Sequence, residues 1–250
     1  MPVSQPKKTR SSKASGREQR AKEALTCLKL SRHDPTKGSL LDLGCGLGEL
    51  TGYFLGEGIS TVGLDINKES LRSVKEKNPR VKLILADGLK LPFKEKCFHT
   101  VILNDVLEHV TYKAGKLMLN QIFVILRKRG KLYISVANKY QIREPHTFVF
   151  FLTWLPRTCY LPIFRSIGSE SIYPYTVRML ERLCKETDFT FENYTWFYAR
   201  KKILNIDYIG DPITRKVVAL LRRINLHNLL FRIAEKFSVI LFVCKKGRSE

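Results

Sequence analysis

A glycine-rich turn between two structured segments is the part of the sequence best suited to hold a ligand. Residues 40–50 read LLDLGCGLGEL: a short apolar strand leads into Gly44, Gly46 and Gly48, and a helix is expected to start at Glu49. Glycine adopts backbone angles closed to other residues and has no Cβ to keep a ligand away from the main chain. A strand, a glycine turn and a helix in this order predict a crevice where a ligand lies close to the backbone.

The spacing of the glycines argues against a turn that binds a dinucleotide pyrophosphate. That fingerprint, G-x-G-x-x-G/A, needs a small sixth residue, but the sixth position is Glu49 counted from Gly44 and Thr51 counted from Gly46. A carboxylate at the start of a helix also repels phosphate. What remains is an acidic residue, Asp42, followed by a G-x-G-x-G loop.

Polar residues follow each of the next three apolar segments as well. The segments are 60–64, 81–86 and 98–103, and the residues after them are Asp65, Asp87 with Gly88, and Asn104. Alternating strands and helices imply a parallel sheet with a ligand crevice at the carboxyl ends of its strands. Asp65 lies 21 residues after Gly44, close to the distance at which such folds place a carboxylate for the two ribose hydroxyls. Capping of the helix at 68–77 is the alternative use of that side chain.

Together, these turns resemble those of the class I S-adenosylmethionine-dependent methyltransferases. The first turn has the form of that family's first motif, and ILNDVLEHV at 102–110 is similar to the segment after the fourth strand of small-molecule and lipid-quinone methyltransferases. The resemblance covers residues 40–136. It implies an α/β fold with a Rossmann-like, seven-stranded, mostly parallel sheet flanked by helices, and with insertions after the fifth strand and between the sixth and seventh strands.

The remaining elements are expected from the same reading. A helix at 114–126 would be closed by basic residues and Gly130, and the fifth strand would run over 131–136. A helix at 176–186 would precede a sixth strand at 189–197. That strand and a seventh at 239–244 would pair as an antiparallel hairpin at the sheet edge, as the resemblance suggests.

The resemblance also implies which residues hold the methyl donor, S-adenosylmethionine. The glycine loop would approach the methionine part of the donor, Asp65 its ribose, Asp87 and Gly88 its adenine, and Asn104 its sulfonium arm. The complete set of expected cofactor-binding residues is Asp42, Gly44, Cys45, Gly46, Gly48, Asp65, Ile66, Asp87, Gly88 and Asn104.

Two histidines are candidate general bases. Methyl transfer from a sulfonium is an in-line displacement in which the protein mainly aligns the acceptor and excludes water. A base is needed only where the acceptor loses a proton on or before attack. His109 and His146 lie near the expected crevice, and a structural histidine beside Pro145 is the alternative for His146.

A metal site is considered at the start of the segment after the fourth strand. Asp105, Glu108 and His109 lie at i, i+3 and i+4 and would share one face of a helical turn. Some quinone O-methyltransferases that this segment resembles hold a divalent cation with a triplet of that pattern, with Glu in place of Asp105. The shorter side chain favours an acidic cap and a crevice-lining histidine instead, and no metal is expected.

The formal charge of +21 is concentrated at the two ends of the chain. Residues 1–24 hold seven Lys/Arg against two Glu, and residues 200–250 hold twelve against four acids. Such ends attract polyanions such as RNA, DNA or anionic lipid headgroups. Residues 1–16 are too poor in apolar groups to fold alone and are expected to be a disordered tail, with residues 17–250 forming one domain that begins with a helix at 17–30.

Cysteine usage and hydropathy predict a reduced, cytoplasmic protein. The six cysteines form no C-x-x-C pair and have no partnering histidine spacing, which argues against a disulfide frame or a zinc site. No uninterrupted apolar run reaches the ~18 residues of a membrane span. The basic N-terminus lacks the apolar run of a secretory signal.

Two inserts set the chain apart. The first, at 138–172, contains TFVFFLTWLPRTCYLPIF at 147–164, which is too apolar to sit in water as a loop and would cover the substrate, pack on the sheet or dip into a membrane. The second, at 200–237, contains two basic amphipathic segments that suit an anionic bilayer face. Two surface helices packed on the domain are the alternative.

These patterns favour a methyltransferase that moves a methyl group to a hydrophobic or lipid-linked small-molecule acceptor, at oxygen, at the cytoplasmic face of a membrane. An RNA or protein methyltransferase that uses the basic ends is the second hypothesis. Against it, residues 104–107 read NDVL rather than the N/D-P-P-Y/F motif of base-directed amino methyltransferases. The third hypothesis is a non-catalytic module that binds S-adenosylmethionine. The oligomeric state is left open.

Overall fold

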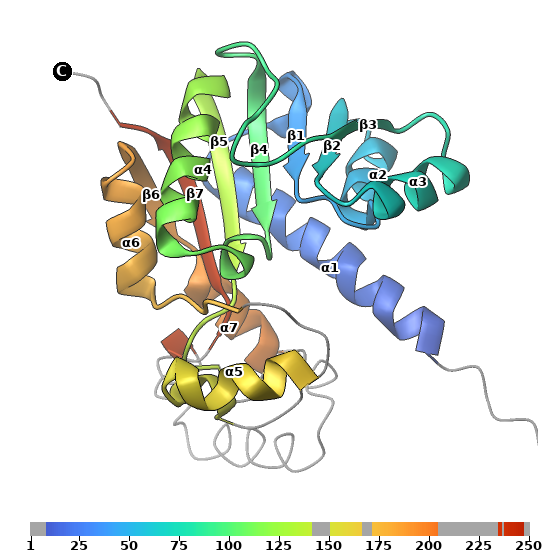
Figure 1. Ribbon diagram of the computed structural model, residues 1–250. Coiled ribbons are helices and arrows are strands. Elements are labelled where there is room, and N and C mark those ends of the chain that lie inside the picture. The colour runs from blue at the N-terminus through green and yellow to red at the C-terminus, as the bar shows by residue number, and fades with distance from the viewer. Residues whose placement is uncertain (1–8, 142–150, 167–171, 205–234, 237, 248–250) are drawn as a thin grey trace, which may run out of the picture. The chain divides into compact units, whose positions relative to one another are not determined.

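The computed structural model describes residues 9–141, 151–166, 172–204, 235–236 and 238–247. Seven strands form one sheet in the order β3-β2-β1-β4-β5-β7-β6, with helices around it (Figure 1). The strands are β1 Leu40–Leu43, β2 Thr61–Asp65, β3 Lys82–Leu85, β4 Phe98–Asn104, β5 Leu126–Val136, β6 Phe189–Asn193 and β7 Ile240–Lys246. The predicted α/β fold with a seven-stranded, mostly parallel sheet is confirmed.

The helices that the structure describes alternate with the strands in the first half of the chain. The α-helices are α1 Thr9–Leu30, α2 Glu49–Gly56, α3 Lys68–Lys77, α4 Tyr112–Ile125, α5 Arg157–Ser166, α6 Val177–Lys185 and α7 Thr195–Leu204. Short 3-10 turns lie at Pro35–Lys37, Leu107–His109 and Leu152–Trp154. None of the helices in the described ranges is long and apolar enough to cross a bilayer.

The chain divides into two compact units. The first contains residues 1–102 and 121–132, and the second contains residues 103–120 and 133–250.

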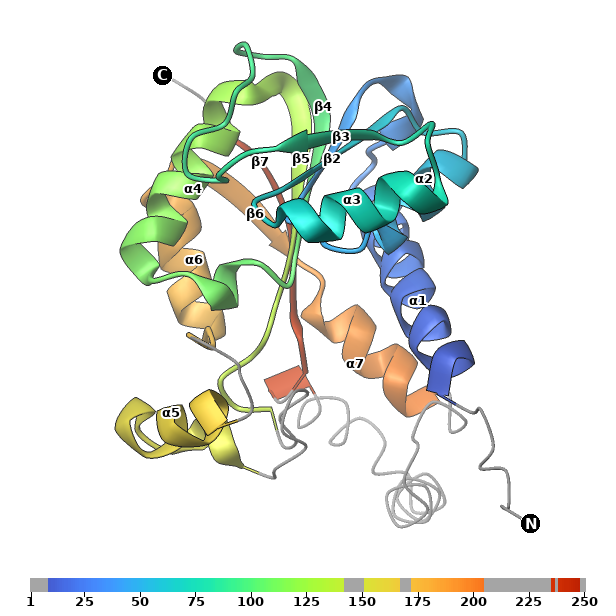
Figure 2. The same cartoon turned by 45° about the vertical axis from the view of Figure 1, so that its right-hand side comes forward.

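In the first unit, β1, β2 and β3 pair in parallel. Leu40 pairs with Thr61, and Gly63 pairs with Leu83. All four residues of β1 are buried, as a central strand with both faces covered requires. Figure 2 shows α2 and α3 beside these strands, and α1 contacts α2. The expected apolar stripe of α1 is buried and consists of Ala21, Ala24, Leu25 and Leu28.

Two predicted boundaries and the alternative capping role of Asp65 differ from the structure in this unit. Helix α1 begins at Thr9, inside the segment expected to be a disordered tail. The N-cap of α3 is Asn67, whose Oδ1 accepts a hydrogen bond from the backbone N–H of Ser70 at 2.9 Å, so Asp65 is not that cap. Strand β5 begins at Leu126, where basic residues were expected to close a helix, because Gly130 lies against β4: a Cβ there would be 2.9 Å from the carbonyl oxygen of His99.

The second unit contains the antiparallel pair that was predicted at the sheet edge. Strands β6 and β7 pair with Phe191 opposite Cys244. The predicted sixth strand is too long, because β6 ends at Asn193 and α7 begins at Thr195. The side chain of Asn193 accepts a hydrogen bond from the backbone N–H of Thr195 at 2.9 Å, which turns the chain away from the sheet.

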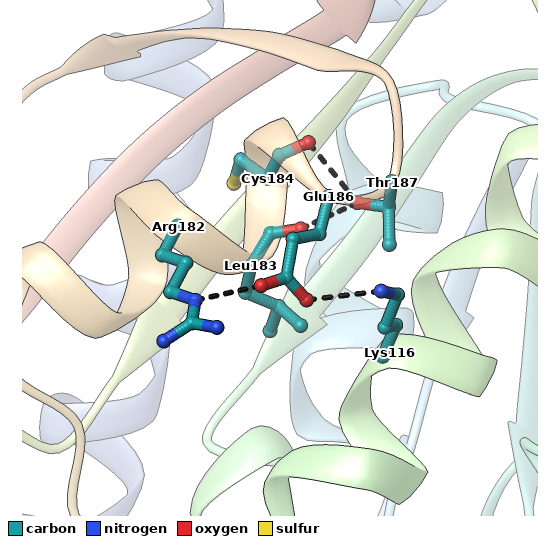
Figure 3. Close-up of polar contacts among 6 residues, drawn as sticks. All are labelled: Lys116, Arg182, Leu183, Cys184, Glu186 and Thr187. Atoms are coloured by element: carbon teal, nitrogen blue, oxygen red, sulfur yellow. Dashed lines mark hydrogen bonds and ion pairs between the residues drawn. The ribbon is translucent and has the colours of Figure 1, made fainter.

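An ion-pair cluster joins α4 to the end of α6 in the same unit. Figure 3 shows the Glu186 carboxylate between Arg182 and Lys116, with Oε1 2.6 Å from Arg182 Nε and Oε2 3.0 Å from Lys116 Nζ. Hydrogen bonds from Lys116 and Arg182 hold the pKa of Glu186 below its ordinary value. Next to it, the Thr187 hydroxyl donates to the carbonyl oxygen of Leu183 at 2.8 Å, which satisfies a terminal helix carbonyl.

Candidate functional site

The glycine loop takes the left-handed conformation that its composition predicts. Gly44, Gly46 and Gly48 have φ values of 75°, 50° and 71°. Gly48 is required for a second reason, because a Cβ at this position would lie 2.7 Å from Cγ1 of Val74 on α3. The loop therefore packs against α3. Because its three glycines have no Cβ, their backbone atoms stay accessible to a ligand.

Hydrogen bonds to the end of β2 fix this loop. The backbone N–H groups of Gly44 and Cys45 both donate to the carbonyl oxygen of Leu64, at 2.8 and 3.0 Å. The next N–H group, that of Gly46, donates to Oδ2 of Asp65 at 2.7 Å. The other carboxylate oxygen of Asp65 accepts from the N–H of Asn67 at 2.9 Å. The juxtaposition of loop and carboxylate that the sequence predicts is present.

Asp42 has a different environment from Asp65. Its side chain is only 2% exposed, and its Oδ2 accepts a hydrogen bond of 2.6 Å from the Thr51 hydroxyl on α2. Burial raises the pKa of Asp42 to about 6. The Asp42 side chain thus links β1 to α2. Thr51 was missed in the sequence, where a lone hydroxyl in a helix carries little signal.

The Cys45 thiol is a packing group in this loop. Burial raises the pKa of Cys45 to about 12, so the thiol stays protonated at neutral pH. Its Sγ would lie 2.9 Å from a Cβ placed at Gly63, which explains a glycine in the middle of β2.

The ends of β2 and β3 lie together beside the loop. The backbone N–H of Ala86 donates to the carbonyl oxygen of Asp65 at 3.1 Å, which places the following turn at Asp87 and Gly88 next to Asp65. The exposed Asp87 carboxylate accepts from the N–H of Leu89 at 2.9 Å. Three of the four predicted strand-end turns therefore line one edge of the first unit.

Apolar side chains are exposed at the same edge. Ile66, directly after Asp65, is 70% exposed, and Leu47, inside the glycine loop, is 45% exposed. A large apolar side chain that stays in water next to convergent polar groups is typical of a ligand site. Ile66 was among the expected residues and Leu47 was not, although its place between two glycines was a usable signal.

Helix α1 adds a charged contact that the sequence did not indicate. Arg17 forms an ion pair with Glu49, the first residue of α2. Further along α1, the Lys22 ammonium lies 5.9 Å from the centre of the Tyr53 ring. Because Glu49 stands at the helix start beside the glycine loop, Arg17 offsets the negative charge there.

The fourth predicted turn, at the end of β4, belongs to the second unit. Oδ1 of Asn104 is buried and accepts no hydrogen bond from the residues that the structure describes. The next residue, Asp105, has a φ of 53° and donates its backbone N–H to the carbonyl oxygen of Ser135 at 2.9 Å. Asn104 thus carries a buried acceptor that a ligand could satisfy.

The predicted shared face of Asp105, Glu108 and His109 is wrong. The segment forms a 3-10 turn in which Glu108 is 2% exposed and His109 is exposed. The Glu108 carboxylate accepts from the backbone N–H of Ala137 at 3.4 Å, which draws it inward. Within the described ranges, no group of three or more His, Cys, Asp or Glu side chains is arranged to hold a metal ion.

Two other expected features lie outside the described residues. These are His146 and the basic amphipathic segments, whose residues 205–234 and 237 are not described. Of the insert at 138–172, the structure describes residues 138–141, 151–166 and 172. Its own small core is made by Leu152, Tyr160, Phe164 and Ile172.

Comparison with known proteins gives a family match over part of the chain. Residues 41–134 match the family profile of a methyltransferase domain. An uncharacterized protein of Methanocaldococcus jannaschii is 38% identical over 109 residues, which are 44% of this chain and 45% of that protein. The ubiquinone biosynthesis O-methyltransferase of Pelagibacter ubique is 31% identical over 123 residues, which are 47% of this chain and 50% of that enzyme. The chain thus spans about half the length of the curated relatives it matches.

A solved structure supports the fold. The crystal structure of a SAM dependent methyltransferase from Archaeoglobus fulgidus superposes with a TM-score of 0.58 at 17% identity, over 92% of this chain and 94% of that one. Residues 41–134 thus match a methyltransferase domain, and the seven-stranded sheet has the fold of the compared methyltransferase structure.

Proposed function

We propose that the protein transfers a methyl group from S-adenosylmethionine to a hydrophobic or lipid-linked small-molecule acceptor, at an oxygen atom. The observation that carries the proposal is the Asp65 carboxylate held 2.7 Å from the backbone nitrogen of Gly46, at the edge where β1 and β2 end. A carboxylate beside a glycine turn suits a nucleoside with vicinal hydroxyls.

The residues of the first unit fit the adenosyl donor. Each Asp65 oxygen accepts one backbone N–H and keeps a lone pair for a ribose hydroxyl. The exposed Ile66 side chain offers an apolar face for the adenine ring, with Asp87 and Gly88 on the neighbouring turn. Gly44, Gly46 and Gly48 leave room for the methionine part. When bound, the donor supplies an activated methyl group on its sulfonium sulfur.

The remaining assignments concern the reacting end. Asn104 is proposed to face the sulfonium arm, and its buried, unsatisfied Oδ1 is consistent with a ligand contact. His109, which is exposed, and His146 are proposed as general bases for an acceptor hydroxyl. Asp42 and Cys45 act on the donor indirectly in this proposal, since both are buried behind the loop.

An apolar acceptor is favoured by the segment after β5. Trp154 lies edge-on to Tyr140 and to Phe151, with ring centres 5.9 and 5.1 Å apart, and all three side chains are exposed. The indole N–H of Trp154 donates to the carbonyl oxygen of Gln141 at 3.2 Å, so the exposed part of the ring is apolar. Aromatic side chains of this kind suit a membrane interface, which we propose to be the cytoplasmic face of an anionic bilayer.

The name of one relative, the ubiquinone biosynthesis O-methyltransferase, points to the same acceptor class and to an oxygen target. The second candidate is an RNA or protein methyltransferase, which the net charge of +21 favours. A non-catalytic donor-binding module is the third.

A labelling experiment separates these functions. Purified protein and methyl-labelled donor are incubated with cell extract, and the lipid, RNA, protein and small-molecule fractions are counted. Label in the lipid fraction that disappears with Asp65→Asn supports the proposal. Label found only in RNA or protein would support an RNA or protein acceptor in place of a lipid. If no fraction is labelled although the donor binds, the non-catalytic module is supported.

A further inference from the structure

The connections that lead into β1 and β4, together with the first residues of β5, carry exposed cations at the edge of the first unit opposite the glycine loop. We call this surface the basic edge. Its seven exposed members are Arg32, Lys37, Lys94, Lys96, Arg127, Lys128 and Arg129. These cations are separated from the glycine loop, either in sequence or by the length of the strands. The proposed methyl transfer uses none of them.

Backbone contacts gather these three stretches of sequence into one surface. The N–H groups of His99 and Thr100 both donate to the carbonyl oxygen of Ser39, at 2.9 and 3.2 Å, so the starts of β1 and β4 are adjacent. The N–H of Lys96 donates to the carbonyl oxygen of Val124 at 3.1 Å, which brings in the residues just before β5.

Side-chain positions show the same gathering. Nη1 of Arg127 lies 3.6 Å from the position of a Cβ on Gly38, next to Lys37. Because Gly130 packs beside His99 at the start of β4, Arg127, Lys128 and Arg129 extend past the start of β4 into solvent. The basic residues of three separate stretches of sequence therefore share one edge.

The charges of the basic edge are poorly compensated. Within residues 32–37, 94–96 and 127–129, which contain all seven cations, the exposed carboxylates are Asp34 and Glu95. The Asp34 carboxylate accepts from the N–H and the hydroxyl of Thr36, at 3.0 and 2.7 Å. The ion pairs that join Arg17, Lys22 and Arg72 to glutamates in the described part of the first unit involve no member of the basic edge.

Two histidines stack against each other beside this edge. The rings of His33 and His99 stack with centres 4.3 Å apart, and His33 Nε2 lies 2.8 Å from the Thr100 hydroxyl. Burial, with lesser effects of His99 and Lys131, lowers the pKa of His33 to about 4, so its ring is neutral at pH 7. The His33 ring therefore adds no charge to this edge at pH 7, and the charges of its lysines and arginines do not vary between about pH 5 and 8.

The position and composition of the basic edge favour a nucleic acid over an anionic bilayer as its polyanionic partner. Strands β1 and β2 run from this edge toward the glycine loop, as the arrows in Figure 1 show. A bilayer bound here would lie at the end of the sheet away from the glycine loop. The exposed apolar residues nearby, Leu30 and Val124, are aliphatic, whereas tryptophan and tyrosine mark membrane interfaces. Arginine and lysine without an aromatic belt suit phosphodiesters of a nucleic acid.

We propose that the basic edge binds the phosphate backbone of a nucleic acid and serves as a docking surface separate from the methyl-transfer site. Binding is independent of base sequence, since the surface offers cations for phosphates. The proposal goes beyond the methyl transfer and does not depend on it.

Fluorescence anisotropy of the full-length protein tests this surface. The probe is a labelled oligouridylate of about 20 nucleotides, titrated at several KCl concentrations. The triple variant Arg127→Gln, Lys128→Gln, Arg129→Gln is expected to bind about tenfold more weakly, and its salt slope is expected to fall by about 2, since each lost phosphate contact to a single strand removes about 0.7. A matched control neutralises three exposed cations elsewhere in the first unit: Lys77→Gln, Arg80→Gln and Lys82→Gln.

The control triple is expected to stay within about twofold of the wild-type affinity. Equal losses in both triples would mean that overall charge, and not the basic edge, binds the probe, and would overturn the proposal. Two other results would also overturn it. The protein could fail to bind the oligonucleotide, or the basic edge could bind vesicles of anionic phospholipid instead of the oligonucleotide. Donor binding measured in the same variants is expected to be unchanged, so the proposed function and this proposal fail separately.

Discussion

Two carboxylates beside the glycine loop have distinct environments and distinct consequences. Asp42 is buried against the Thr51 hydroxyl, whereas Asp65 stands at the end of β2 and accepts from the backbone N–H groups of Gly46 and Asn67. A buried carboxylate with one short hydrogen bond holds elements together, and a carboxylate among convergent N–H donors can also hold a ligand. We therefore propose that Asp42 positions the glycine loop and that Asp65 contacts the donor.

Thr51→Val is expected to lower the free energy of unfolding by about 1 to 3 kcal/mol at pH 8, because the Asp42 carboxylate loses its hydrogen bond in a buried site. Urea denaturation measures this loss. Thr51→Ser, which keeps the hydroxyl, is expected to retain most of the stability. The loss should shrink at pH 5, where Asp42, whose pKa is raised to about 6, is largely protonated. A loss that is the same for valine and serine would contradict the assignment.

His33 and Asp42 make contributions to stability that change with pH in opposite directions. The pKa of His33 is lowered from an ordinary value of 6.5 to about 4 in the folded protein, so its contribution is present above pH 6.5 and is lost as the pH falls toward 4. The pKa of Asp42 is raised from 3.8 to about 6, so its contribution is present below pH 3.8 and is lost as the pH rises through 6. The two contributions oppose each other between these limits.

His33→Gln keeps a hydrogen-bonding group for Thr100 but cannot take up a proton. Between pH 7 and pH 5 the wild type is expected to lose about 1 kcal/mol more stability than the variant, after allowance for solvent screening. Urea denaturation at both pH values measures the difference, and the Asp42 contribution cancels because both proteins carry it. Identical pH profiles for the two proteins would contradict the buried, neutral His33.

At the scale of elements, the glycine loop depends on its packing against α3. Gly48→Ala is expected to lower the free energy of unfolding by about 2 kcal/mol or more, because the residue has a φ of 71° and the new Cβ would meet Val74 at 2.7 Å. The matched control is Gly52→Ala in α2, where a Cβ meets nothing within 4 Å; it is expected to be neutral or stabilising by about 0.5 to 1 kcal/mol. Thermal or urea unfolding measures both variants. Equal changes in the free energy of unfolding would contradict the packing argument.

The exposed aromatic residues after β5 make a second prediction at this scale. Trp154→Ala is expected to weaken binding of the protein to anionic phospholipid vesicles by about 1 kcal/mol, or about fivefold, because a half-exposed ring no longer enters the interface. Co-sedimentation with vesicles measures the binding. Leu117→Ala in α4, where the side chain is 50% exposed, is the control and should bind as the wild type does. The same loss in both variants would point to general hydrophobicity.

Elements with a strong local signal could be predicted from the sequence. The start of α2 and both bounds of α3 agree to the residue, since a glycine turn and an asparagine cap mark the starts of these helices. The start of β5 could not be predicted, because a basic run followed by glycine is also a good helix end. Helix α7 was missed because TWFYARKKIL is rich in aromatic residues that are equally common in strands.

The candidate site was predictable to the extent that it depends on strand ends. The turns after β1, β2 and β3 lie side by side in the first unit as the sequence predicts. Thr51 and Arg17 could not be found, because their roles depend on which helix face meets β1 and α2, and that is fixed by packing. The helical face expected for Asp105, Glu108 and His109 is absent because Asp105, with a φ of 53°, lies before the short 3-10 turn, in which Glu108 is buried and His109 is exposed.

At the scale of the whole molecule, charge was predictable in amount but not in place. The sequence puts its excess of lysine and arginine at the two ends, where residues 1–24 and 200–250 carry much of the +21. The basic edge escaped notice because Lys37, Lys96 and Arg127 come from stretches that are distant in the sequence and meet only when β1, β4 and β5 align. The order of the strands in the sheet therefore brings charges that are distant in the sequence onto one surface.

The central claim is that the glycine loop and Asp65 hold the adenosyl donor, and titration calorimetry with S-adenosylhomocysteine tests it most directly. The wild type is expected to bind one equivalent. Asp65→Asn is expected to bind at least about tenfold more weakly, because its amide group replaces an oxygen that accepts a backbone N–H and a ribose hydroxyl. Gly52→Ala should bind as the wild type does. A wild-type protein that releases no heat of binding, or an Asp65→Asn variant with unchanged affinity, would contradict the claim.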